Sequence, residues 1–108
     1  MAKVVWTDNA IADLEDIGDH ISKDSVRYAE ITVERLFESV DILEKHPKCG
    51  KKLATFNNDN LRELIRGNYR IVYFIKDSLR IDILTVHNCA RELGNTFDFT
   101  DWVDPIED

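Results

Sequence analysis

Positively charged side chains recur through residues 61–91, which read LRELIRGNYRIVYFIKDSLRIDILTVHNCAR. They lie in and around three apolar runs that are separated by turn signals at residues 66–68 and 76–78. The residues that stand out in and around these runs are Arg62, Arg66, Arg70, Arg80, His87 and Arg91. Cations within strands are either paired internally or presented to an anionic partner.

Internal pairing is the simpler interpretation for most of these cations. Arg62 and Glu63 point to opposite faces of a strand, so each is expected to pair across strands rather than with the other. Arg70 has Glu63 or Asp82 as a candidate partner, and a lone histidine such as His87 is usually a hydrogen-bonded structural group. The basic stretch before the strands is either solvated or a contact surface, and it consists of Lys45, Lys48, Lys51 and Lys52.

The three apolar runs predict an antiparallel meander, because β-branched and aromatic residues dominate each of them. The expected strands are Leu61–Arg66, Tyr69–Lys76 and Leu79–His87. Both alternating sets of the middle run are apolar, which is typical of a central strand covered on both sides. The preceding segment, Pro47–Asn60, is rich in turn-forming residues and predicts a loop.

Upstream of that loop the apolar spacing is helical, after a short strand candidate at Lys3–Trp6. Residues 7–8 can cap a first helix, and residues 24–25 can cap a second that ends near His46, because a proline follows. We therefore expect an α+β domain with an N-terminal strand and an α-helical hairpin packed on a small antiparallel sheet. The expected core residues are Val5, Ile11, Leu14, Ile17, Val33, Leu36, Phe37, Val40, Leu43, Leu64, Ile71, Val72, Tyr73, Ile83 and Val86.

Charge is segregated along the 108 residues, whose net charge is −7. Residues 1–44 hold 11 acids and 4 bases, residues 45–91 hold 4 acids and 10 bases, and residues 92–108 hold 6 acids and no base. The overall acidity disfavours nucleic-acid binding, whereas the basic segment at residues 45–91 is compatible with it.

Composition narrows the class of protein further. The length suits one domain, and no apolar run is long enough to cross a bilayer. The opening MAKVVW lacks the apolar core of a signal peptide, so we expect a cytoplasmic protein with no membrane partner. Cys49 and Cys89 lack metal-ligand spacing and are expected to be free thiols, and no metal or cofactor is expected.

Several short motifs accompany these elements in a specific order. They are Trp6-Thr7-x-x-Ala10-x-x-Asp13-Leu14, Leu43-x-x-x-Pro47-x-x-Gly50, Arg62-Glu63-Leu64, Tyr69-Arg70-Ile71-Val72-Tyr73 and Val86-His87-x-x-x-Arg91. With the order strand, helix, helix and three strands, they resemble the RelE/ParE toxin superfamily over residues 3–93. The resemblance implies a small bacterial toxin domain at residues 1–93, neutralised by a cognate antitoxin encoded beside it, followed by an acidic C-terminal tail at residues 94–108.

The superfamily includes members that cut messenger RNA on the ribosome and ParE-like members that poison DNA gyrase. RNA cleavage through the 2′-hydroxyl needs a base, cations for the phosphate and an acid for the leaving oxygen. RelE-like nucleases are similar to one another in taking these from strand lysines, strand arginines and a basic C-terminal segment with a tyrosine. Here residues 61–64 include no lysine, no tyrosine follows Arg91, and the chain is acidic, so the ParE-like branch is favoured.

The resemblance thus implies a toxin that inhibits an essential target, DNA gyrase, by protein–protein contact rather than by its own catalysis. Candidate partner-binding residues are Arg62, Arg66, Lys51 and Lys52. The alternative is a RelE-like, ribosome-dependent mRNA endonuclease, for which the candidate catalytic residues are Arg70, His87 and Arg91. A further alternative is an inactive antitoxin-binding or DNA-repressing module.

The acidic segment at residues 92–108 departs most from the family pattern. It contains Phe97, Phe99, Trp102 and Val103 among its acids, and these residues could anchor it on an apolar surface. We expect the segment to dock on the protein, across the basic sheet, while a loose tail that only aids solubility is the alternative.

Overall fold

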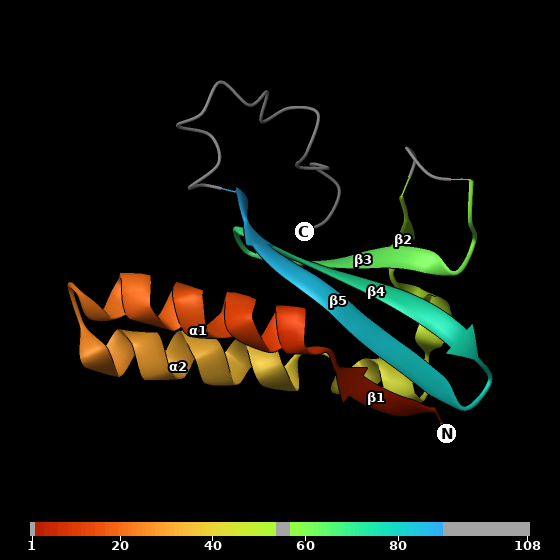
Figure 1. Cartoon of the computed structure of the whole chain (residues 1–108), viewed down its shortest axis with the longest axis horizontal. Coiled ribbons are helices and arrows are strands. Elements are labelled where there is room, and N and C mark those ends of the chain that lie inside the picture. Colours follow the sequence, from red (N-terminus) through yellow and green to blue (C-terminus); the bar gives the residue numbers. More distant parts are fainter. Residues whose placement is uncertain (1, 54–56, 90–108) are drawn as a thin grey trace.

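The computed structural model describes residues 2–53 and 57–89, which form a mixed sheet and a helical hairpin (Figure 1). Its elements are β1 (Lys3–Trp6), α1 (Asp8–Ser22), α2 (Val26–Glu38), the 3₁₀ helices η1 (Asp41–Glu44) and η2 (Pro47–Cys49), β2 (Lys51–Lys52), β3 (Leu61–Arg66), β4 (Tyr69–Asp77) and β5 (Arg80–Asn88). The α+β architecture expected from the sequence is confirmed. Arg91 and the acidic segment at 92–108 lie outside the described residues.

The five strands lie in the order β1-β5-β4-β3-β2, with β4 at the centre. All neighbours are antiparallel except β1, which pairs in parallel with β5, so that Lys3 lies opposite Arg80 and Trp6 opposite Ile83. The meander was expected, and the two-residue strand β2 is an addition inside the segment predicted to be a loop. Gly67 has a φ of 61° in the turn between β3 and β4, a conformation that glycine adopts readily in tight hairpins.

Both helices begin at the predicted caps. The Thr7 hydroxyl oxygen accepts a hydrogen bond from the Ala10 N–H at 3.2 Å, and the Ser25 hydroxyl oxygen accepts one from the Tyr28 N–H at 3.0 Å. The second helix ends at Glu38, so the prediction that it reaches His46 was wrong. The Ser39 N–H bonds to two carbonyls, those of Arg35 and Leu36, a sharing common at helix ends, and η1 follows.

The core lies between α1, the end of α2, η1 and the face of the sheet that carries Ile71, Tyr73 and Ile75. Most of the expected core residues are buried, but Ile11 and Phe37 were wrongly placed there, with 39% and 49% of their surface exposed. The Phe37 ring instead stacks on Trp6 at the surface, with ring centroids 5.3 Å apart. Three expected core residues, Val5, Val33 and Val72, are half-buried, whereas Ile75 and Ile81 are buried without having been predicted.

The start of α1 continues the cover of β5, because β1 pairs with β5 only as far as Ile83. Beyond that point three side chains from the start of the first helix bond to the strand. The Thr7 hydroxyl donates to the Ile83 carbonyl at 2.6 Å, the Asn9 amide donates to the Leu84 carbonyl at 2.9 Å, and the Asp13 carboxylate accepts from the Val86 N–H at 3.0 Å. In the described part of the chain, none of the helices is long and apolar enough to span a membrane.

On the core side, the hydroxyl of Tyr73 fixes the turn that leads into β2. It donates to the Pro47 carbonyl at 2.7 Å and accepts from the Gly50 N–H at 2.9 Å. A Cβ at position 50 would lie 2.7 Å from the Glu63 carbonyl oxygen and closer still to the Tyr73 hydroxyl, so only glycine fits. Burial raises the pKa of Tyr73 to about 12, since an ionised phenolate would be desolvated there.

We predict that Tyr73→Phe destabilises the protein by about 1–3 kcal/mol at neutral pH, because it leaves the buried Gly50 N–H without its partner. The raised pKa adds a pH dependence. The unfolded tyrosine ionises near pH 10 but the native one only near pH 12, so wild-type stability falls by roughly 2 kcal/mol as pH rises through that window. Urea unfolding between pH 8 and 12 should show this decline in the wild type and a shallower one in Tyr73→Phe. The exposed Tyr28→Phe serves as control, and equal declines in all three proteins would contradict the account.

Candidate functional site

The face of the sheet turned away from α1 and α2 is called the outer face here, and it carries Leu61, Glu63, Ile65, Arg70, Val72, Phe74, Asp82 and His87. At its centre, Arg70 Nη1 lies 2.6 Å from both carboxylate oxygens of Glu63. Each of these residues has only 6% of its surface exposed. His87 lies directly opposite Arg70 in the register of β4 and β5, and it is half-buried.

This geometry constrains the chemistry that Arg70 can perform. The expected pairing of Arg70 with Glu63 is present, while Asp82 instead accepts from Arg80 at 2.7 Å. A guanidinium that is bonded to a carboxylate and nearly excluded from solvent is poorly placed to receive a phosphate. The structure therefore brings Arg70 and His87 together but holds Arg70 in an internal ion pair. Arg91 lies outside the described residues.

The four candidate partner-binding residues gather on β2 and β3, at the edge of the sheet farthest from β1. Lys51 and Lys52 lie opposite Glu63 and Arg62, and the Lys52 ammonium forms an exposed ion pair with Asp59 at 3.3 Å. Arg66 is exposed at the end of β3 and donates to the carbonyl of its neighbour Ile65.

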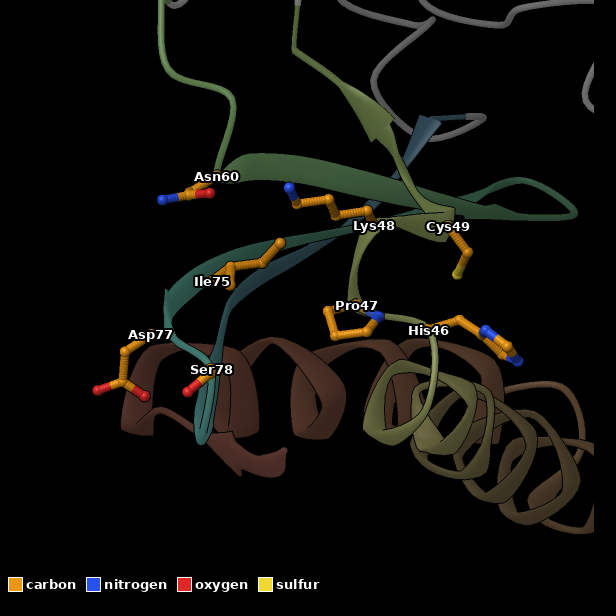
Figure 2. A pocket seen from close by; sticks show the side chains of 8 residues that line it. All are labelled: His46, Pro47, Lys48, Cys49, Asn60, Ile75, Asp77 and Ser78. Atoms are coloured by element: carbon orange, nitrogen blue, oxygen red, sulfur yellow. The ribbon is translucent and has the colours of Figure 1, made fainter. Parts of the chain in front are cut away.

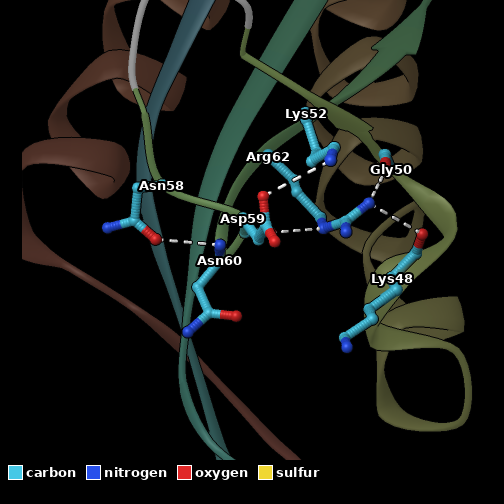
Figure 3. Close-up of polar contacts among 7 residues, drawn as sticks. All are labelled: Lys48, Gly50, Lys52, Asn58, Asp59, Asn60 and Arg62. Carbon is cyan, nitrogen blue, oxygen red and sulfur yellow. Dashed lines mark hydrogen bonds and ion pairs between the residues drawn. The ribbon is translucent and has the colours of Figure 1, made fainter.

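Arg62 differs from the other three, because its guanidinium holds the loops on either side of β2 (Figure 3). Its Nε donates to the Asp59 carbonyl at 2.8 Å, and its Nη1 donates to the carbonyls of Gly50 at 2.8 Å and Lys48 at 3.2 Å. Arg62 also lies opposite Tyr73 in the register of β3 and β4. Together the two side chains bind the backbone of residues 47–50 and so position the lysines that follow.

Part of this edge is open to a further strand. The Leu61 carbonyl accepts from the Leu53 N–H, while the Asn60 carbonyl accepts from the β4 residue Ile75. By alternation, the backbone groups of Glu63 and Ile65 point away from β4. Because β2 ends its pairing at Lys51 opposite Glu63, the N–H of Ile65 faces outward beyond that strand. We call the segment Glu63–Arg66, with Lys51 and Lys52, the open edge; sequence periodicity alone gave no signal for it.

A pocket of about 680 Å³ lies between residues 46–49 and the end of β4 (Figure 2). It is lined by His46, Pro47, Lys48, Cys49, Asn60, Ile75, Asp77 and Ser78. Neither Arg70 nor His87 is among these residues, so the pocket does not bring these two catalytic candidates to a substrate. Within residues 2–53 and 57–89, no group of three or more histidine, cysteine or acidic side chains is placed to hold a metal ion.

The buried ion pair predicts an asymmetry between removing one partner and removing both. Glu63→Gln should destabilise the protein by about 3–5 kcal/mol, because the Arg70 charge stays buried without a counter-charge. Replacing the pair with Glu63→Leu and Arg70→Met should recover most of that loss. Lys52→Ala, at the exposed pair with Asp59, should cost less than about 1 kcal/mol. Urea unfolding measures all three, and a Glu63→Gln loss no larger than that of Lys52→Ala would contradict the described pairing.

Comparisons with known proteins agree with this fold. Residues 4–93 match the family described as the ParE toxin of the type II toxin–antitoxin system parDE. The chain is 39% identical to "Toxin RelE2" of Caulobacter vibrioides over 92 residues, which cover 84% of this chain and 99% of that protein. It is 28% identical to the "Putative toxin Y4kP" of Sinorhizobium fredii, covering 83% of this chain and 91% of that protein.

Two solved structures are also similar. One is the chromosomal ParDE toxin–antitoxin system from P. aeruginosa, with a TM-score of 0.66 and 25% identity over 82% of this chain and 96% of the other. The second is the toxin–antitoxin complex RelBE2 from Mycobacterium tuberculosis, with a TM-score of 0.53 and 28% identity over 81% and 90%. The superfamily resemblance noted from the motifs is confirmed, and the chain belongs to the ParE toxin family of type II toxin–antitoxin systems.

Proposed function

We propose that this chain is a type II toxin that acts on its target by protein–protein contact rather than by cutting RNA. The observation that carries the proposal is the state of Arg70. The strand arginine that could clamp a phosphate is 6% exposed and bonds to both oxygens of Glu63. RNA cleavage also needs a base and an acid, and residues 61–64 include no lysine that could assist.

The proposed target is DNA gyrase, which the ParE-like resemblance suggests. The contact surface that we propose is the open edge, where Lys51 and Arg66 are exposed and Arg62 and Tyr73 hold the preceding turn. Exposed cations at the rim of a contact mainly raise the association rate, so their effect should weaken with salt. The runner-up function is ribosome-dependent mRNA cleavage. It would require Arg70, His87 and Arg91 rather than the cations of the open edge.

The two functions are separated by assaying both in parallel. We predict that the purified chain inhibits gyrase supercoiling and leaves mRNA intact on programmed ribosomes. Inhibition should weaken in a Lys51→Glu, Arg66→Glu variant and persist in Lys3→Glu, because Lys3 is equally exposed but lies at the opposite edge of the sheet. Ribosome-dependent cleavage that is abolished by Arg70→Ala or Arg91→Ala would overturn the proposal in favour of the runner-up.

Neutralisation by a cognate antitoxin is proposed on the same structural basis. The two solved structures named above are of toxin–antitoxin systems. The side of β5 beyond β1 is already bonded to Thr7, Asn9 and Asp13, whereas the N–H of Ile65 at the open edge points outward. A segment of the antitoxin can therefore add a strand beside β3.

Strand addition at this edge predicts a specific backbone effect. Ile65→Pro removes the outward N–H without removing a bond to β4, and proline is tolerated on edge strands. It should weaken antitoxin binding well beyond the effect of Ile65→Ala, which removes only the side chain and serves as the matched control. Titration calorimetry with the antitoxin encoded beside the toxin gene measures both, with thermal melts to show that the variants fold. Equal affinities of the two variants would exclude strand addition at Ile65. They would not contradict the proposal that an antitoxin binds, because it could bind at another surface.

A further inference from the structure

The outer face is more apolar than a solvated sheet face needs to be. Phe74 lies opposite Leu61, Val72 lies opposite Glu63, and Ile65 lies opposite Arg70 in the register of β3 and β4. All four apolar residues are half-buried, although α1 and α2 pack on the other face (Figure 1). A sheet with one solvated face normally alternates apolar and polar residues. The stripe formed by Leu61, Ile65, Val72 and Phe74 therefore has the character of a covered surface.

The described charges on this face nearly balance, because Arg70 pairs with Glu63 and Arg80 pairs with Asp82, and Lys51 adds one further cation. Lys51 lies opposite Glu63, and the segment that carries the stripe has an excess of bases. Residues 45–91, which include the whole stripe, hold 10 bases and 4 acids, whereas residues 92–108 hold 6 acids and no base. Charges of opposite sign tethered this closely attract each other over a Debye length of about 8 Å at physiological salt.

The chain leaves the sheet at the edge of the same face. β5 ends at Asn88, which lies opposite Tyr69, one residue from the Arg70–His87 pair. The 17 residues at 92–108 can span roughly 55 Å when extended, and the nine residues of β4 span roughly 30 Å. The length and the point of departure thus allow the acidic segment to run along the whole apolar stripe.

We propose that residues 92–108 of this chain dock on the outer face and cover it. Phe97, Phe99, Trp102 and Val103 pack on the apolar stripe, and the acids between and beyond them lie near the surrounding cations. This arrangement covers the apolar stripe and shields the outer face from anionic partners. The docking surface is the outer face, whereas the proposed contacts with the target and the antitoxin are at the open edge, so this proposal does not depend on either contact.

Fluorescence of Trp102 in the full chain tests the docking. In a Trp6→Phe background, which keeps an aromatic ring against Phe37, Trp102 is the only tryptophan. Acrylamide should quench it several-fold less than a free indole. Phe74→Ser, which cuts the centre of the stripe, should raise the quenching constant, whereas Leu79→Ser, at a residue 69% exposed outside the stripe, should not. If Trp6→Phe fails to fold, the quenching of Trp102 is obtained by subtracting the fluorescence of Trp102→Phe from that of the wild type, with Trp6 retained in both.

Three outcomes would overturn the proposal. A Trp102 that is quenched like a free indole means a solvated acidic tail. Shielding that Phe74→Ser leaves unchanged means that the segment lies elsewhere on the protein. Shielding that disappears on dilution, together with a dimer by sedimentation, means that a second copy supplies the segment. Shielding that persists in the monomer and is lost in Phe74→Ser supports the proposal.

Discussion

A buried guanidinium must be matched by a counter-charge, and Arg70 meets this constraint through Glu63. Nη1 of Arg70 lies 2.6 Å from both carboxylate oxygens, and each residue is 6% exposed. Because losing one partner of such a pair costs far more than the pair contributes, β3 and β4 must keep both residues in register. The same pairing removes from solvent the arginine that a nuclease would use. The view of this toxin as a contact protein depends on that one interaction.

Within residues 2–53 and 57–89, the sheet leaves the edge of β3 beyond β2 open to partners. Thr7, Asn9 and Asp13 bond to β5 where β1 stops, so that part of β5 is already occupied. At the opposite edge, Tyr73 and Arg62 bind the backbone of residues 47–50 and so position β2, which is only two residues long. The edge of β3 beyond β2 therefore keeps outward backbone groups next to exposed cations. Strand addition and charge-assisted contact are the two modes of binding that such an edge supports.

Much of the fold could be predicted from the sequence, because its signals are local. Apolar spacing and capping residues at Thr7 and Ser25 located both helix starts, and alternation located the three main strands. Phe37 followed the helical apolar pattern yet lies at the surface, because its ring packs against Trp6 from a distant strand. The early end of α2 was also missed. There the Ser39 N–H bonds to two carbonyls, and the spacing of apolar residues does not indicate such a shared bond.

The residue types of the site and a short list of partners for Arg70 could be predicted, but the role of Arg62 could not. Arg62 and Arg70 carry equal charge in the sequence, yet one holds a loop by its carbonyls and the other pairs with Glu63. These roles depend on strand register and on the position of residues 47–50, which are long-range features. The superfamily could be recognised from motif order, since the motifs mark the same elements that the structure contains.

Growth inhibition by the charge-free pair tests the central claim most directly. The variant with Glu63→Leu and Arg70→Met keeps the packing of the outer face but lacks the arginine that catalysis would need. After induction without antitoxin, contact-based action predicts that this variant still arrests growth and that mRNA stays intact in the wild type. A folded double variant that binds antitoxin but no longer arrests growth, with wild-type cells showing cleaved mRNA, would contradict it.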